Sequence, residues 1–297
     1  MTSIIKNGLL SSGWYGWRLG RDRLPGVLVL CYHGIRPDAY ISDGMVFSNL
    51  HMPSRTFEGH LRVISQCCHP ISLGEWRHAI TTGRPLPKRA VLVTFDDGYR
   101  SVFTIARPML KRYGISASIF VCSEPIRQQQ LFWFDAMART DGEAAVMDAI
   151  AHDSVAASKR SQASPATTDD PLAPLTVDQL KTLADEGFEI GAHTATHARL
   201  AAASETDQTA EITRCRDMLS GWLRRPVTTL AYPWGQPGVD YTRQTVEIAE
   251  RLGFDFAFTT NSAFAGSREA PLERSRFVVL ASVRPAELAH RITYSWR

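Results

Sequence analysis

Short hydrophobic runs recur along the chain and are separated by longer stretches of mixed polarity. The runs are rich in β-branched residues and mostly continuous rather than alternating with polar residues, which is typical of strands buried on both faces. They lie at residues 27–32, 91–95, 117–121, 188–192, 229–233, 256–260 and 277–280. The pattern therefore predicts about seven buried strands.

The stretches between the runs carry helix signals. Ser54, Thr176 and Ser204 each stand at the start of such a stretch, as residues at helix N-termini often do. Gly187 and Pro226 follow the ends of the second and third stretches, where helices commonly stop. Strands that alternate with helices predict parallel strands joined by right-handed crossovers.

Polar residues follow the ends of several predicted strands, namely His33, Asp96, Asp97, His193 and Trp234. In a barrel of parallel strands all carboxyl ends share one rim, so these side chains would converge. An open doubly wound sheet would gather them only at its switch point. We therefore predict an α/β fold built on an incomplete or distorted barrel, with the open sheet as the alternative.

Residues 152–174 interrupt the alternation of predicted strands and helices. They are rich in Ser, Ala, Thr, Pro and Asp and offer little to bury. Such a composition predicts a mobile surface insertion, near enough to the rim to act as a lid. Because the sequence shows no internal repeat and no second hydrophobic core, residues 1–297 are predicted to form a single domain.

The composition is that of an ordinary soluble protein, with 44% hydrophobic and 21% charged residues. The formal net charge is only +3, and no dense Lys/Arg cluster with interleaved aromatic residues gives support to nucleic-acid binding. The 5 cysteines are odd in number, lack zinc-type spacing and include the neighbours Cys67 and Cys68. That usage suits a reducing compartment.

The first residues have no continuous apolar run and no small-residue cleavage site, so they do not resemble a secretory signal. No later stretch approaches the ~20 apolar residues that cross a bilayer. A cytoplasmic enzyme is therefore expected. For Trp14, Tyr15 and Trp17 we favour packing against the domain, with peripheral membrane contact as the alternative.

Two clusters carry chemistry. His193 and His197 stand four residues apart directly after a predicted strand, and Asp96 and Asp97 follow another. Two imidazoles and one carboxylate make a three-ligand metal site with open positions for water, suited to zinc and tolerant of other divalent ions.

The adjacent aspartates also suggest a division of roles. Neighbouring carboxylates repel each other unless a cation neutralises one of them. If Asp97 binds the metal, Asp96 can remain ionised and take a proton from a water that the metal has made more acidic. The alternative is structural, with Asp96 capping the next helix and Asp97 facing solvent.

Four motifs carry a resemblance to a known family: "CYHGI" (31–35), "TFDDG" (94–98), "HTATH" (193–197) and "AYPWG" (231–235). In this order they resemble the polysaccharide deacetylase family, also called the NodB-homology or carbohydrate esterase 4 group. The first motif resembles the subgroup of exopolysaccharide synthesis. The resemblance extends from about residue 27 to 280. It implies a distorted (β/α)7 barrel.

The resemblance also implies roles for individual residues. Asp96 would be the catalytic base, and Asp97, His193 and His197 would hold the metal. The backbone N–H of Trp234 would help to bind the oxyanion that forms when water attacks an acetamide carbonyl.

The chain departs from the family pattern in two places. Ala231 stands where many members have an arginine that steers the base, so Arg274 or Arg276 would have to supply that charge, and we choose Arg274. Near the last strand, where the family often has its general acid, the chain offers only His290. His33, at a strand end, is the better candidate to protonate the leaving amine.

The aromatic and remaining histidine residues receive simpler interpretations. Trp133 is expected in the core, whereas Trp234 is expected to stack on a sugar ring. The remaining histidines are interpreted as structural or surface residues: His51, His60, His69, His78 and His152.

Together these features predict a hydrolase that depends on a divalent metal, with zinc expected, and that removes acetyl from an N-acetylated sugar. The alternatives are an O-acetyl esterase on a glycan and a carbohydrate-binding homologue that has lost activity. In a cytoplasmic protein the substrate would be met before export. We therefore expect a short or lipid-linked oligosaccharide at the cytoplasmic face of the membrane.

Overall fold

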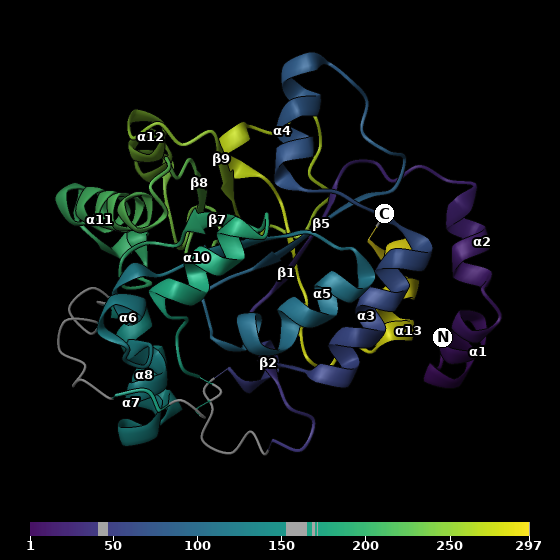
Figure 1. Ribbon diagram of the computed structural model, residues 1–297, viewed down its shortest axis with the longest axis horizontal. Coiled ribbons are helices and arrows are strands. Elements are labelled where there is room, and N and C mark those ends of the chain that lie inside the picture. Colours follow the sequence, from purple (N-terminus) through teal and green to yellow (C-terminus); the bar gives the residue numbers. More distant parts are fainter. Residues whose placement is uncertain (41–46, 153–164, 168–169, 171, 297) are drawn as a thin grey trace.

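The computed structural model describes residues 1–40, 47–152, 165–167, 170 and 172–296. Its centre is a curved sheet of parallel strands in the order β10-β1-β5-β6-β7-β8-β9 (Figure 1). Short strand β4 (His69–Pro70) also pairs with β5. Every predicted strand is present. Their bounds are β1 Leu28–Tyr32, β5 Ala90–Phe95, β6 Ala117–Val121, β7 Glu189–Ala192, β8 Thr229–Ala231, β9 Phe256–Phe258 and β10 Phe277–Val278.

One segment, residues 274–279, joins the two edges of this sheet. At its start the backbone of Arg274 pairs with Phe258 of β9. Three residues later Phe277 pairs with Leu30 of β1. The strands therefore wrap into a distorted barrel that a single irregular segment completes, which confirms the predicted fold over the open sheet.

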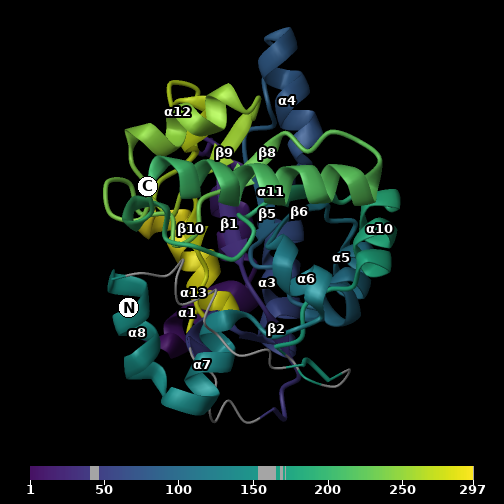
Figure 2. The same cartoon turned by 90° about the vertical axis from the view of Figure 1, so that its left-hand side faces the viewer.

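Helices surround the sheet, and α11 runs across the strands in the second view (Figures 1 and 2). Two two-residue strands, β2 (Ile35–Arg36) and β3 (Met52–Pro53), pair with each other outside the barrel. The helices are α1 Ser3–Ser11, α2 Trp14–Gly20, α3 Ser54–Cys67, α4 Leu73–Thr82, α5 Arg107–Tyr113, α6 Ser123–Gln128, α7 Trp133–Asp141, α8 Glu143–His152, α10 Val177–Asp185, α11 Glu205–Leu223, α12 Arg243–Arg251 and α13 Pro285–His290.

Two of the three residues that the sequence places at helix starts are N-terminal caps in the structure. Thr176 caps α10 with a reciprocal pair of hydrogen bonds to Gln179, and the hydroxyl of Ser204 accepts from the N–H of Asp207 at the start of α11. Such caps satisfy N–H groups that have no partner within the helix. Ser54 is the first residue of α3 rather than its cap.

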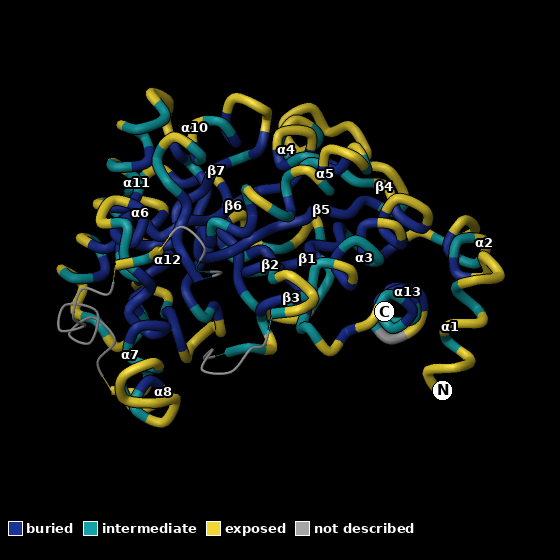
Figure 3. The backbone as a smooth tube through the Cα atoms, turned by 60° about the horizontal axis from the view of Figure 1, so that its bottom comes forward, coloured by how far each residue is buried: buried dark blue, intermediate teal, exposed yellow. Residues whose placement is uncertain are grey.

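The barrel interior is filled with apolar side chains, and the strands are the most buried part of the chain (Figure 3). Phe120, Phe256 and Phe258 lie within this interior cluster, where the Phe258 ring is tilted against Phe120 and stacked on Phe256. A filled interior leaves no channel, so polar chemistry is confined to the ends of the barrel.

The predicted insertion at residues 152–174 lies mostly outside the described residues. Its last part differs from the prediction, because Leu172 and Ala173 are buried. The C=O of Ala173 accepts from Arg100 N–H at 2.7 Å, and Leu175 N–H donates to the C=O of Gly98 at 2.9 Å. This stretch is therefore tied to the loop that follows β5. That residues 1–297 form a single domain stays a prediction.

Helices α1 and α2 lie together at one side of the molecule, where they contact α13 and α3 (Figure 1). Tyr15 is fully buried there, as predicted. Trp14 and Trp17 differ from the prediction, since they are 39% and 50% exposed. Among the described helices, none has both the length and the hydrophobicity needed to span a membrane.

Candidate active site

The turn after β5 sends two adjacent carboxylates into different surroundings. Asp97 has a φ of 72° and Gly98 a φ of 98°, both in the left-handed region. A Cβ on Gly98 would come within 2.9 Å of a Val121 methyl group, so only glycine fits. Strain of this kind in a non-glycine residue is typical of functional sites.

Asp97 faces both histidines that were predicted as its partners. Its Oδ1 is 3.5 Å from His193 Nε2 and 3.3 Å from His197 Nε2. The three side chains are buried, and one potential ligand atom from each lies within 4.8 Å of the others. Asp97 Oδ1 nevertheless has no hydrogen-bond partner among the described residues. Lone pairs gathered around one point in this way are the arrangement of a cation site.

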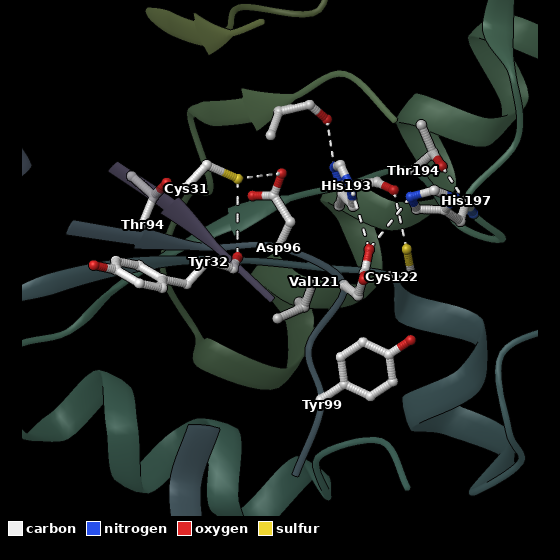
Figure 4. A network of polar contacts seen from close by, with 12 residues as sticks. Cys31, Tyr32, Thr94, Asp96, Tyr99, Val121, Cys122, His193, Thr194 and His197 are labelled. Atoms are coloured by element: carbon white, nitrogen blue, oxygen red, sulfur yellow. Dashed lines mark hydrogen bonds and ion pairs between the residues drawn. The ribbon is translucent and has the colours of Figure 1, made fainter. Parts of the chain in front are cut away.

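Backbone contacts orient the two imidazoles, as Figure 4 shows for His193, His197 and Thr194. His193 Nδ1 donates to the C=O of Ala231 at 2.7 Å, which leaves its Nε2 lone pair directed at Asp97. His197 has a φ of 63°, and its N–H donates to Thr194 Oγ1 at 3.1 Å. The His193 ring is thereby fixed toward Asp97, whereas His197 is held through its backbone, since its Nδ1 has no hydrogen-bond partner among the described residues.

Charges in this cluster favour a bound divalent ion. Burial acts to raise the pKa of Asp97, but the imidazoles of His193 and His197 outweigh burial and hold that pKa well below its usual value. Burial lowers the pKa of His197, so this ring is neutral. Burial also acts to lower the pKa of His193, but Asp96 and Asp97 raise it overall. A metal ion would displace the proton that these carboxylates attract.

Asp96 is held by a different partner. Its two carboxylate oxygens each accept from Arg276, at 2.7 Å from Nη1 and 2.7 Å from Nη2. The thiol of Cys31 lies 3.4 Å from Oδ2, and Figure 4 shows Cys31 and Asp96 side by side. Burial acts to raise the pKa of Asp96, but the guanidinium of Arg276 lowers it overall. Asp96 is thus an ionised, fixed carboxylate beside the candidate metal site.

The choice of Arg274 as the partner of the base is wrong, because Arg276 occupies that position. Both arginines reach the barrel interior, where Arg274 is 4% exposed and Arg276 is fully buried. They lie at different depths: Arg274 is 5.6 Å from the Phe256 ring, whereas Arg276 is 5.7 Å from the Phe258 ring. Two residues of extended chain carry Arg276 ~7 Å nearer the rim that holds Asp96.

Asp96, Asp97 and both histidines open into a cavity of about 270 Å³. His33 also lines it from the loop after β1, and its Nδ1 is buried without a partner among the described residues. One ligand atom each of Cys31, His33 and Asp96 lie within 4.8 Å of one another.

His290 lies elsewhere. It is on α13 with Nδ1 3.4 Å from the Tyr15 hydroxyl, and it is not among the residues of the cavity. Placement in the structure therefore favours His33 over His290 as the general acid.

His51 is a cavity residue that the sequence interpretation missed. It is 3% exposed, and burial together with His33 lowers its pKa to about 3, so the ring is neutral. Pairing of β3 with β2 brings it there. Gly34 leaves it room, because a Cβ at that position would lie 2.3 Å from His51 Nδ1.

Trp234 follows β8 with a φ of 61°, and Gly235 has a φ of 78°. The C=O of Trp234 accepts from Thr260 Oγ1 at 2.7 Å, whereas its own N–H has no acceptor among the described residues. Its ring centroid is 4.7 Å from that of His197. The residue that carries this free N–H therefore borders the candidate metal site.

Two further aromatic rings complete the wall of the cavity. Phe134 lies 5.2 Å from the His197 ring, and Phe47 lies 5.5 Å from the Trp234 ring. Trp133 is buried beside Phe134, as predicted for a core residue. Of the three adjacent aromatic residues at 132–134, Phe134 alone lines the cavity, and the sequence analysis did not single it out.

Comparison with known proteins identifies the family of this barrel. Residues 83–257, more than half of the chain, match the family model described as polysaccharide deacetylase. YxkH of Bacillus subtilis (strain 168), provisionally named a polysaccharide deacetylase, is 24% identical over 242 residues, which cover 81% of this chain and 66% of YxkH. A shorter match of 44 residues is 46% identical to the poly-β-1,6-N-acetyl-D-glucosamine N-deacetylase of Escherichia coli (strain K12) and covers 15% of this chain but 6% of that enzyme.

A solved structure shares the fold. The deacetylase PplD of Streptococcus pyogenes, in complex with acetate, superposes with a TM-score of 0.67 at 23% sequence identity. The similarity covers 90% of this chain and 98% of the PplD chain. The barrel and its surrounding helices are thus those of a NodB-type deacetylase.

Proposed function

The chain belongs to the polysaccharide deacetylase family, and we propose that it removes acetyl groups from N-acetylated sugars of a glycan by metal-dependent hydrolysis. The observation that carries this proposal is the separation of the two neighbouring aspartates. Asp97 faces two imidazoles, whereas Asp96 is paired with Arg276. A site that only bound metal would need Asp97 but would have no use for a second, fixed carboxylate.

Asp97, His193 and His197 would hold the metal ion. Ligand atoms ~2.0–2.1 Å from a tetrahedral zinc lie ~3.3 Å apart. The distances of 3.3 Å and 3.5 Å between Asp97 Oδ1 and the two Nε2 atoms agree with that spacing, which supports zinc. When bound, a divalent ion supplies Lewis-acid polarisation of the acetyl carbonyl and makes water more acidic.

Asp96 would serve as the general base. As the oxygen of water attacks the acetyl carbon, Asp96 takes the proton that this oxygen loses. The bidentate contact with Arg276 keeps the carboxylate ionised and fixes its direction. The N–H of Trp234 would donate to the carbonyl oxygen as it gains negative charge.

His33 would complete the reaction. When the carbon–nitrogen bond breaks, His33 gives a proton to the sugar nitrogen, and the products are acetate and a free amine. The rings of Phe134 and Trp234 form an apolar wall on which a sugar could stack.

A pair of histidine variants tests this assignment. His33→Ala should lower turnover ~10²-fold or more, because a positioned acid typically contributes ~10²–10⁴-fold, and it should retain the metal. His290→Ala is the matched control and should keep wild-type turnover, since His290 lies outside the cavity. Steady-state acetate release and metal content of both variants give the answer. A silent His33→Ala together with an impaired His290→Ala would reverse the assignment.

The acetyl linkage is tested by comparing substrates. The Escherichia coli relative is named for N-deacetylation of poly-β-1,6-N-acetyl-D-glucosamine, so we propose N-acetylglucosamine oligomers as substrates. Acetate release should be faster from these oligomers than from an O-acetylated glycan of equal length. Preference for the ester would instead assign an O-acetyl esterase, and sugar binding without any acetate release would assign a binding protein.

We also propose that the substrate is met at an anionic membrane surface, on the cytoplasmic side. Support comes from the large hydrophobic side chains that the described part of the chain exposes. Most of them gather on α1, α2 and the neighbouring C-terminal turn: Met1, Ile4, Ile5, Trp14, Trp17 and Tyr294. Trp14 Nε1 donates to the Tyr294 hydroxyl at 3.0 Å, which joins these elements in one N-terminal patch. All 5 cysteines are free, which supports the reducing side.

Charge adds to this patch. Residues 1–26 contain 4 of the 33 Lys and Arg residues but 1 of the 30 Asp and Glu residues. The remaining 29 residues of each sign cancel, but Lys6 is paired with Glu287, Arg18 is paired with Asp22 and Arg23 lines a different surface, so Arg21 is the cation of this patch. Arg21 lies over the Trp17 ring at 3.9 Å. Aromatic rings beside basic residues favour the interface of an anionic bilayer.

Vesicle binding tests the N-terminal patch. The double variant Trp14→Ser/Trp17→Ser should bind vesicles of phosphatidylglycerol and phosphatidylcholine at least ~10-fold more weakly than wild type, since two exposed indoles no longer enter the interface. Met147→Ser, which removes a side chain of the same 50% exposure elsewhere, is the control. Sedimentation with vesicles measures both. Equal binding by wild type and double variant, or no binding by wild type, would contradict the proposal.

A further inference from the structure

A second cavity, of about 760 Å³, lies at the opposite end of the barrel from the candidate active site. It is lined by residues 23–27, which lead into β1, and by residues 83–88 and Ala90, which lead into and begin β5. The amino ends of the parallel strands therefore form this groove, whereas the candidate active site occupies the carboxyl ends. We refer to this cavity as the basal groove.

Arg274 reaches the basal groove from the barrel interior. The side chain is 4% exposed, and its guanidinium lies 5.4 Å from the Trp76 ring and 5.6 Å from the Phe256 ring. Nη1 donates to the C=O of Gly266 at 2.7 Å. Nε is buried and has no hydrogen-bond partner among the described residues.

The charge of Arg274 is not neutralised within the described part of the chain. No carboxylate there lies within ion-pair distance of it, in contrast to Arg276, which binds Asp96 through two hydrogen bonds. Burial lowers the pKa of Arg274, and the more distant Glu269 opposes this effect. A buried charge without a partner is costly, so the site is suited to an anion from outside.

The rest of the basal groove is also positively charged. Arg23, Arg84 and Lys88 line it and are exposed, and the residues that line the groove include no aspartate or glutamate. One wall is apolar, with Trp76 buried and Ile80 51% exposed. A cationic floor beside an apolar wall fits an anionic group attached to a hydrophobic body.

We propose that the basal groove binds a phosphate group carried on an apolar chain or ring, with Arg274 as its central contact. The planar guanidinium presents paired N–H donors that match phosphate oxygens, and its unused Nε is one of them. Arg23, Arg84 and Lys88 add long-range attraction for the charge. Because the groove lies at the other end of the barrel, this binding does not require the metal or Asp96.

Titration calorimetry with the full chain tests the proposal with three probes: inorganic phosphate, phenyl phosphate and dodecyl phosphate below its micellar concentration. Dodecyl phosphate should bind most tightly if the source is a lipid phosphate, and phenyl phosphate if it is a soluble ester. Dodecyl maltoside, which is uncharged, should not bind. Failure of all three phosphates to bind, or equal binding of the maltoside, would overturn the proposal.

Variants assign the binding to the groove. Arg274→Gln should weaken binding of the best probe by ~10- to 100-fold, since it removes hydrogen bonds from a charged donor. Arg62→Gln, an exposed arginine on α3, is the control and should bind as wild type. In phosphate-free buffer Arg274→Gln should lower the melting temperature less than Arg276→Gln does, because it loses the hydrogen bond to Gly266 but no ion pair. If this variant fails to fold, the surface double variant Arg84→Gln/Lys88→Gln decides, and unchanged affinity there would overturn the proposal.

Discussion

Asp96→Asn is expected to lower acetate release by ~10²–10⁴-fold while the protein keeps its metal. Asparagine has nearly the same shape as aspartate but cannot accept the proton of the attacking water. The proposed metal ligands Asp97, His193 and His197 are untouched by the change. Turnover and metal content of the purified variant measure the two effects separately, and wild-type turnover would refute the assignment of the base.

Stability needs its own control, because Asp96→Asn leaves Arg276 buried without an anionic partner. Breaking a buried ion pair in this way typically costs ~3–5 kcal/mol of folding free energy. The double variant Asp96→Asn/Arg276→Met removes both charges and should regain most of that stability while remaining inactive. Denaturant unfolding and acetate release therefore distinguish a missing base from a damaged fold. Recovery of activity in the double variant would show that Asp96 is not the base.

Loss of the metal ligands is expected to have an equally large effect by a different route. Changing Asp97, His193 or His197 to Ala should weaken divalent-ion affinity by more than ~100-fold, since even residues that only orient a ligand contribute ~10–100-fold. Activity should fall in step with metal content. Elemental analysis after dialysis against buffered zinc provides the measurement.

His51→Gln is the matched control for these variants. His51 lines the same cavity and is as buried as the three ligands, but it is not part of their cluster. It should therefore retain a full equivalent of metal. A full equivalent of metal in both His193→Ala and His197→Ala would rule out the proposed site. Loss of metal in His51→Gln alone would instead show that His51 is a ligand and that the metal site lies elsewhere in the cavity.

The barrel could be predicted because its signals are local. Seven hydrophobic runs became strands, and the capping residues Thr176 and Ser204 mark helix starts in the structure. Parallel strands place their carboxyl ends at one rim, so the convergence of Asp97, His193 and His197 followed from topology. Their contacts in the structure agree with that prediction.

Arg276 could not be chosen from the sequence, because depth inside a barrel depends on how the sheet closes. Arg274 and Arg276 share a face and both stand just before the last strand. Only the pairing of Arg274 with Phe258 of β9 fixes which guanidinium reaches the rim. Hydrophobic periodicity carries no information on that register.

His51 and Phe134 were missed for a related reason. His51 enters the cavity through the pairing of β2 with β3, two strands of two residues each that have no detectable pattern. Phe134 is one of three adjacent aromatic residues, and sequence spacing cannot decide which of them faces a cavity. The burial of Leu172 and Ala173 could not be predicted either. They lie in a polar segment, and two apolar residues are too few to form a periodic signal.

Zinc-dependent acetate release tests the central claim most directly. Protein stripped with a chelator should release no acetate from N-acetylglucosamine oligomers, and activity should return in proportion to added zinc up to one equivalent per chain. Asp96→Asn should bind the same equivalent and stay inactive. Full acetate release by the stripped protein, or by zinc-loaded Asp96→Asn, would contradict the division of roles between Asp96 and Asp97.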